Sequence, residues 1–292
     1  MTALILALIA GALYTGSNLV ARKVLKDGSD AWSYSFIFSS IGLIVTLPLL
    51  LVEYLAAAFN NTERLSESAG HEPSLLILVV IAMGLIVVAH NAALFSANNY
   101  ISPSVNGSIY KLRLIWLALI GTVFFQESLT DGLKLGTLLV VASGVILAGG
   151  MKGKKSLLGI TLVAAASVFY AVGLSASKFL LTDLTSLQVT TLVFAVPAAL
   201  NLPIIYRRRE RFLALWQKHK KLVLMGGVLG AFANICVFAA LATENISVVP
   251  LLIEAFLVVT FAGEIIILRE RENLKLKLLA VALSILGSIL VL

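Results

Sequence analysis

Long apolar runs alternate with short polar segments along the whole chain. Crossing about 30 Å of hydrocarbon takes roughly 20 helical residues. Backbone groups in lipid must pair internally, and these runs are too long for the strands of a barrel. The pattern therefore predicts an all-α membrane protein with ten transmembrane helices, at residues 2–24, 31–57, 74–99, 103–125, 131–149, 157–181, 185–205, 221–243, 246–268 and 274–292.

Two connections are longer than the others. Residues 58–73 are expected to form a hydrophilic loop. Residues 206–221 are strongly basic and are expected to form a loop or a short amphipathic helix on the membrane surface. The first apolar run starts without a basic leader or a convincing cleavage site, so it is predicted to be a retained helix.

The second half of the chain repeats the first. A shift of 156 or 145 residues superposes Tyr14 on Tyr170, Arg22 on Lys178, Ile101 on Ile246 and Glu127 on Glu272. The predicted domains are two five-helix repeats, at residues 1–150 and 151–292. Because five is an odd number, the two repeats must be inserted in opposite directions. Inverted repeats of this kind support alternating access, with the substrate site near the midplane.

Composition agrees with a membrane protein and excludes other classes. Hydrophobic residues make up 60% of the chain and charged residues 13%, so a soluble domain is excluded. The net charge of +7 does not indicate nucleic-acid binding, because 17 of the 20 Lys and Arg residues outside the fourth span lie in alternate connections. By the positive-inside rule, both termini face outward. The single Cys236 is expected to be a packing residue.

Several stretches resemble a known family. Residues 12–20 (ALYTGSNLV), followed by Lys23, resemble the first helix of EamA-type carriers in the drug/metabolite transporter superfamily. Residues 124–130 (FFQESLT), followed by Gly136 and Gly144, resemble that family's link between helices four and five. Residues 271–274 (RENL) with Gly287 form a weaker second copy. The resemblance covers essentially the whole chain.

The resemblance implies a carrier or exporter of amino acids, other small metabolites or drugs. It also implies a cavity lined by helices one to four and six to nine, with helices five and ten peripheral. The chain departs from the family in two respects. The proline that many members carry in helix four is absent, where Arg113 and Leu114 stand. Members are also often described with both termini in the cytoplasm, contrary to the charge count.

Ionisable residues inside the predicted spans are functional candidates, because a charge in the bilayer is costly unless it is paired or hydrated. Lys111 and Arg113 lie in the fourth span, and Glu254 lies in the ninth. A zwitterion could bind between them, its carboxylate near Lys111 or Arg113 and its amine near Glu254. The alternative is a direct ion pair that joins the repeats. Lys111 and Arg113 are about 200° apart around a helix, so both cannot face one cavity, and Arg113 is favoured.

Other polar residues complete the predicted site. His90 could carry a coupling proton because histidine titrates near neutral pH, and Glu254 is the other candidate for that role. Glu264 is expected to form an interfacial ion pair with Arg269 or Arg271. The remaining predicted substrate-binding residues are Tyr14, Asn18, Asn91, Tyr110, Tyr170 and Asn234.

The sequence therefore predicts a secondary transporter of the inner or plasma membrane, most simply an exporter of an amino acid or another zwitterion. The alternatives are an organic-anion carrier and a lipid flippase or other lipid-handling protein. The sequence has no metal-spaced His/Cys/Asp cluster, no Walker loop and no serine–histidine pairing. No enzyme activity, cofactor or nucleic-acid partner is expected. The protein is expected to be a monomer or a homodimer in the bilayer.

Overall fold

The fold is known from a computed structural model, which describes residues 2–26, 28–59, 71–149, 154–263, 265–266 and 274–290. Across these residues the regular structure is helical and contains no strand, which confirms the prediction of an all-α protein. The helices are α1 (Thr2–Leu25), α2 (Ala31–Phe59), α3 (Pro73–Ala97), α4 (Pro103–Tyr110), α5 (Arg113–Phe124), α6 (Asp131–Gly149), α7 (Lys154–Leu180), α8 (Ser186–Arg207), α9 (Arg209–Leu241), α10 (Val248–Ile253), η1 (Glu254–Phe256), α11 (Leu257–Gly263) and α12 (Leu274–Ile289).

Seven helical segments in the described part of the chain are long and apolar enough to cross a bilayer. They are α1, α2, α3, the α4–α5 run from Val105, α7, α8 and α9. Large apolar side chains such as Leu51, Val52 and Phe124 lie exposed on the outside, as expected of a surface that faces lipid. The chain is therefore a multi-pass membrane protein. A count of ten spans, which would add α6, α12 and the shorter run from Val248 to Gly263, stays a prediction.

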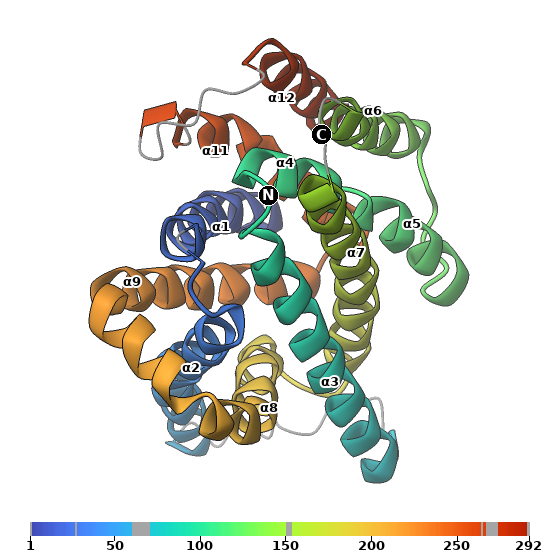
Figure 1. The fold of residues 1–292 in the computed structure, drawn as a ribbon. Helices are drawn as coiled ribbons and strands as arrows, with labels where there is room; N and C mark the ends of the chain where they lie inside the picture. Colours follow the sequence, from blue (N-terminus) through green and yellow to red (C-terminus); the bar gives the residue numbers. More distant parts are fainter. Residues whose placement is uncertain are drawn as a thin grey trace.

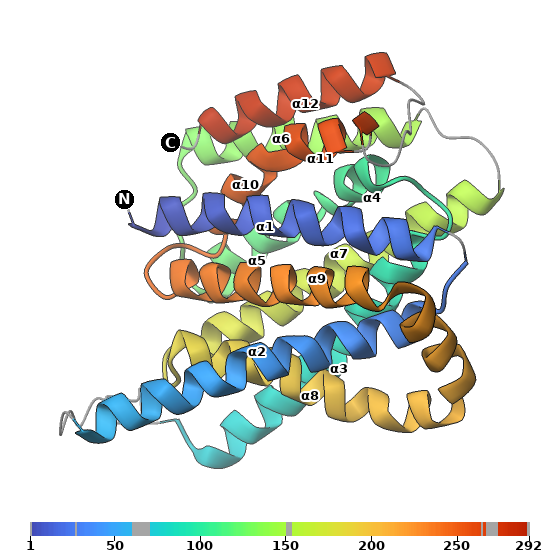
Figure 2. The same ribbon diagram turned by 90° about the vertical axis from the view of Figure 1, so that its left-hand side faces the viewer.

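Helices from the two halves of the chain pack side by side. α1 lies along α9, α3 along α7, α2 against α8 and α9, and α6 along α12 (Figure 1). α9 runs in the opposite direction to α1 (Figure 2). If the halves are inverted repeats, the α1–α9 and α3–α7 pairs are equivalent to each other. The inverted-repeat arrangement itself stays a prediction.

Of the two expectations for the basic segment at 206–221, a loop or an amphipathic helix, the structure shows a helix. α8 continues to Arg207 and α9 begins at Arg209, so almost the whole segment is helical. Phe212 and Trp216 pack beside the buried Leu215, whereas Arg211 is exposed. This alternation of apolar and basic residues has the period of an amphipathic helix, which explains why the segment folds against the bundle. α9 then bends and enters the bundle (Figure 2).

Both spans that carry buried charge are interrupted at the charged residues. Lys111 and Leu112 separate α4 from α5, and the amide of Leu114 bonds to the carbonyl of Lys111 at 2.9 Å. In the second half, the 3₁₀ turn η1 begins at Glu254, directly after α10. Tight i to i+3 turns within a helix often mark a functional site. The α4–α5 run is therefore interrupted even though it lacks the proline that many family members carry in their fourth span.

Candidate functional site

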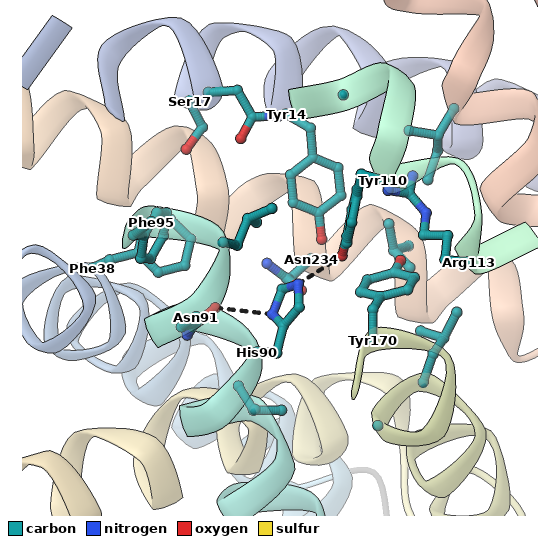
Figure 3. Close-up of a pocket in the computed structure, with 18 of the residues that line it drawn as sticks. Tyr14, Ser17, Phe38, His90, Asn91, Phe95, Tyr110, Arg113, Tyr170 and Asn234 are labelled. Atoms are coloured by element: carbon teal, nitrogen blue, oxygen red, sulfur yellow. Dashed lines mark hydrogen bonds between the residues drawn. The ribbon is translucent and has the colours of Figure 1, made fainter. Parts of the chain in front are cut away.

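A cavity of about 190 Å³ lies between the α1–α9 pair and the α3–α7 pair. Its walls come from both halves of the chain. α2, α8, the α4–α5 run and the turn at Glu254 complete the lining. Figure 3 shows the labelled side chains pointing toward one another from these helices.

An ion pair between the two halves lies in the cavity wall. The guanidinium of Arg113 donates to Oε1 of Glu254 at 2.6 Å. Both residues are buried, with only 6% and 7% of their surface exposed. Two charges taken out of water are stable only when each compensates the other, and removal of one partner strongly destabilises the remaining charge. The structure therefore contains the direct ion pair that the sequence analysis gave as an alternative.

Two aromatic rings hold the Arg113 guanidinium. It lies 4.0 Å from the ring centre of Tyr110 and 4.8 Å from that of Tyr170. The electron-rich face of an aromatic ring attracts a cation, most strongly when water is excluded. A guanidinium is planar and weakly hydrated, so it suits such a site better than an ammonium does. The rings therefore fix the Arg113 guanidinium beside the carboxylate of Glu254.

Two partners orient the ring of His90. Its Nδ1 lies 3.2 Å from Oδ1 of Asn91, and its Nε2 lies 2.7 Å from the hydroxyl of Tyr110 (Figure 3). An amide oxygen only accepts hydrogen bonds, so Nδ1 carries a hydrogen; in the neutral ring Nε2 then accepts from the Tyr110 hydroxyl, and in the protonated ring it donates to it. His90 thereby orients the same tyrosine ring that stacks on Arg113.

The other side of the cavity is aromatic and apolar. The ring centre of Phe38 lies 5.7 Å from that of Phe95 and 5.9 Å from that of Phe194. Figure 3 places Phe38 and Phe95 across the cavity from Arg113 and Tyr170. The cavity therefore has a charged side and a hydrophobic side.

The structure brings nine of the ten predicted binding residues to this cavity. These are Tyr14, Asn18, His90, Asn91, Tyr110, Arg113, Tyr170, Asn234 and Glu254. That they bind a substrate stays a prediction.

Lys111 is the predicted residue that lies elsewhere. Its side chain is fully buried, and its ammonium donates to the hydroxyls of Ser143 at 3.0 Å and Ser284. These serines belong to α6 and α12, on the side of the helix opposite Arg113. The prediction that Lys111 and Arg113 face different directions around the helix therefore agrees with the structure. Glu264 and its expected partners Arg269 and Arg271 lie outside the described residues.

Sequence reasoning missed the aromatic and amide residues that complete the lining. Phe38, Phe95 and Phe194 look like ordinary residues of an apolar span, and nothing in their spacing marks them. Asn106 shares a helix sector with Arg113 and Tyr110, which favoured Arg113 as the binding residue, and Asn98 lies close to a span end. The structure joins these two by a 3.0 Å hydrogen bond, and both line the cavity. Within the described residues, no group of three or more His, Cys, Asp or Glu side chains could hold a metal ion.

Comparisons with known proteins bear on both the family and the fold. Residues 157–292 match the model of the EamA-like transporter family. A solved structure described as "Crystal structure of protein" is similar in fold, with a TM-score of 0.67 and 18% sequence identity, over 99% of this chain and 95% of the other. At that identity the likeness concerns the fold alone. No curated protein matches the sequence.

Proposed function

Because this chain belongs to the EamA-like transporter family through residues 157–292, we propose that it is a secondary transporter that exports a small zwitterion, most simply an amino acid, by alternating access. The two halves form inverted repeats in this proposal, and the cavity between them is the substrate site. The observation that carries the proposal is the buried pair of Arg113 and Glu254 in the cavity wall.

The charges of this pair select a zwitterion. A substrate carboxylate can bind the Arg113 fork in two parallel hydrogen bonds, while a substrate ammonium binds the Glu254 carboxylate. Such an exchange opens the pair and still leaves every buried charge compensated. A simple anion would compensate Arg113 and leave Glu254 without its partner, and a simple cation would do the reverse. An uncompensated buried charge costs about 3–5 kcal/mol, so both should bind far more weakly.

The shape of the cavity favours a small solute with an apolar side chain. Its volume is about 190 Å³, whereas pockets for drug-sized ligands measure roughly 300–1,000 Å³. An amino acid held by Arg113 and Glu254 would extend its side chain toward Phe38 and Phe95. A neutral amino acid with a large aliphatic or aromatic side chain therefore fits both sides of the cavity.

An organic-anion carrier is the second candidate. The observation in its favour is the second buried cation, Lys111, which gives the group of Arg113, Lys111 and Glu254 one excess positive charge. Lys111, however, directs its ammonium to two serines outside the cavity. A lipid-handling protein is the third candidate, and the small volume of the cavity speaks against a lipid substrate.

Proton coupling would use the same residues. Once a substrate ammonium is absent and Arg113 is engaged elsewhere, Glu254 could take up a proton. His90 presents Nε2 to Tyr110, and its protonation would turn that hydrogen bond around. In this proposal one of these two residues carries the coupling proton.

A thermal-shift assay on the purified protein tests the proposal. The ligands form matched sets: leucine with isocaproate and isoamylamine, and phenylalanine with phenylpropionate and phenethylamine. A ligand at 100 times its Kd stabilises a fold by about 2.7 kcal/mol. We expect the amino acid of each set to raise the unfolding temperature, and neither analogue to do so at the same concentration. Equal stabilisation by the carboxylates would establish the organic-anion carrier, and stabilisation by phospholipids alone would establish a lipid-handling protein.

A further inference from the structure

Two basic side chains, one in each half, bind the backbone at the ends of other helices. Near the end of α1, the guanidinium of Arg22 donates to the carbonyl of Asn98, the residue that follows α3. Near the end of α7, the ammonium of Lys178 donates to the carbonyl of Leu241, the last residue of α9, and at 2.8 Å to that of Glu244. Arg22 and Lys178 coincide when the sequence is shifted by 156 residues.

The chemistry of both contacts is the same. The last carbonyls of a helix have no amide donor within the helix and carry partial negative charge. A cation that donates to them satisfies the carbonyl and interacts favourably with the helix dipole. A hydrogen bond that involves a charged group is also stronger than one between neutral groups. Each contact therefore holds one helix end firmly to its neighbour.

The two contacts lie at opposite ends of the cavity. Arg22 joins the carboxyl ends of α1 and α3, and Lys178 joins the carboxyl ends of α7 and α9. Because α9 runs opposite to α1 along its side, these ends lie on opposite faces of the bundle (Figure 2). Each contact also crosses from the α1–α9 pair to the α3–α7 pair, and the cavity lies between these pairs. Separation of the pairs at either face requires the local contact to break.

We propose that Arg22 and Lys178 are two equivalent latches that control the opposite entrances of the cavity. Release of the Lys178 latch opens one face while the Arg22 latch holds the other, and the reverse follows in the second half of the cycle. Both latches are formed in the structure. Because they use the same chemistry, the two open states differ little in free energy, as a transporter requires in order to populate both. This inference rests on the proposed function and adds the elements that control access to its site.

Pairs of spin labels measure the opening of each face directly, without any substrate. One pair, Thr182→Cys with Thr243→Cys, spans the Lys178 face. The other pair, Lys23→Cys with Tyr100→Cys, spans the Arg22 face. All four positions are exposed, and Cys236→Ser removes the native thiol. Each pair is combined with Lys178→Gln, Arg22→Gln or the matched control Lys134→Gln, whose side chain lies exposed in α6.

We expect Lys178→Gln to raise the ratio of open to closed distances across its own face about tenfold, because a hydrogen bond to a charged group is lost, and to leave the other face unchanged. Arg22→Gln should do the opposite, and Lys134→Gln should change neither face. Lys178→Arg keeps a charged donor and should restore the closed distance. Equal changes at both faces, or no change in a folded variant, would overturn the latches. If both glutamine variants unfold, Lys178→Arg provides the test. A folded Lys178→Arg variant that opens its own face would also overturn the latches.

Transport is measured separately with the same variants in proteoliposomes. Normal leucine uptake together with unchanged distances overturns the latches and leaves the proposed function in place. Face-specific distance changes without transport of any tested solute overturn the proposed function and leave the two latches as elements that open the bundle.

Discussion

The energetic coupling between Arg113 and Glu254 can be measured with a double-mutant cycle of Glu254→Gln, Arg113→Met and the double variant. Removal of one partner from a buried ion pair costs about 3–5 kcal/mol. In Glu254→Gln the amide oxygen still accepts from Arg113, and the rings of Tyr110 and Tyr170 still stabilise the cation, each by up to about 2 kcal/mol. We therefore expect this variant to lose only about 2–3 kcal/mol of unfolding free energy.

Arg113→Met should cost more, about 3–5 kcal/mol, because it leaves a buried carboxylate without its guanidinium. The double variant buries neither charge, so it should be more stable than the sum of the single losses by about 2–4 kcal/mol. The assay is thermal unfolding of the purified variants in detergent. For a chain of this size, 1 kcal/mol corresponds to about 2 °C in Tm, so Glu254→Gln should unfold about 4–6 °C below the wild type.

Independent sites add to within about 0.5 kcal/mol. If the losses of the two single variants add up to the loss of the double variant within this limit, the 2.6 Å contact contributes no coupling. The argument that only a zwitterion can open the pair would then fail. A control pair, Lys134→Gln with Asp131→Asn, removes an exposed salt bridge on α6. Exposed ion pairs are typically worth less than about 1 kcal/mol, so its coupling should be near zero.

Three further outcomes follow from the structure. Lys111→Met replaces a fully buried ammonium with an apolar side chain of similar length, so proteoliposome transport should stay within about threefold of the wild type; a loss of tenfold or more would favour the organic-anion carrier. Gly144→Ala places a methyl group against a carbonyl oxygen of α4, so the unfolding temperature should drop by several degrees, since overpacking costs about 1–3 kcal/mol; an unchanged temperature would contradict this close helix contact. Desolvation raises the pKa of Asp183, but the hydrogen bonds to His71 and Thr182, together with the charge of His71, outweigh it and lower that pKa overall. The resulting stabilisation is present above the pKa of an unfolded Asp, about 3.9, and is lost below it. Asp183→Asn should therefore lower the unfolding temperature at pH 7 and have little effect at about pH 3. An equal effect at both pH values would contradict a lowered pKa of Asp183.

The hydrophobic pattern predicted the helices well because length and apolarity are set directly by the bilayer. The predicted span at 31–57 and α2 (Ala31–Phe59) differ only at one end. The apolar runs do not mark where a helix continues beyond them, as at the start of α9; there the mixture of basic and apolar residues indicated an amphipathic helix as the alternative to a loop. The hydrophobic pattern also could not predict the interruption at Lys111 and Leu112, because neither residue is a helix breaker and the turn depends on tertiary contacts.

The cavity was partly predictable for a related reason. A charge within a span is costly, so Arg113 and Glu254 stand out in the sequence itself. The angular separation of Lys111 from Arg113 followed from helix geometry alone. The role of Phe38 and Phe95 could not be predicted, because an aromatic residue has no distinct spacing when it faces a cavity rather than lipid.

The most direct measurement for the central claim is transport of a labelled neutral amino acid by proteoliposomes that contain either the wild-type protein or Glu254→Gln. The account predicts saturable uptake by the wild type, competed by other zwitterions and not by their deaminated analogues. It predicts loss of that uptake in Glu254→Gln at an equal amount of folded protein. Equal uptake by the two proteins would contradict the claim that Glu254 binds the ammonium group of the substrate.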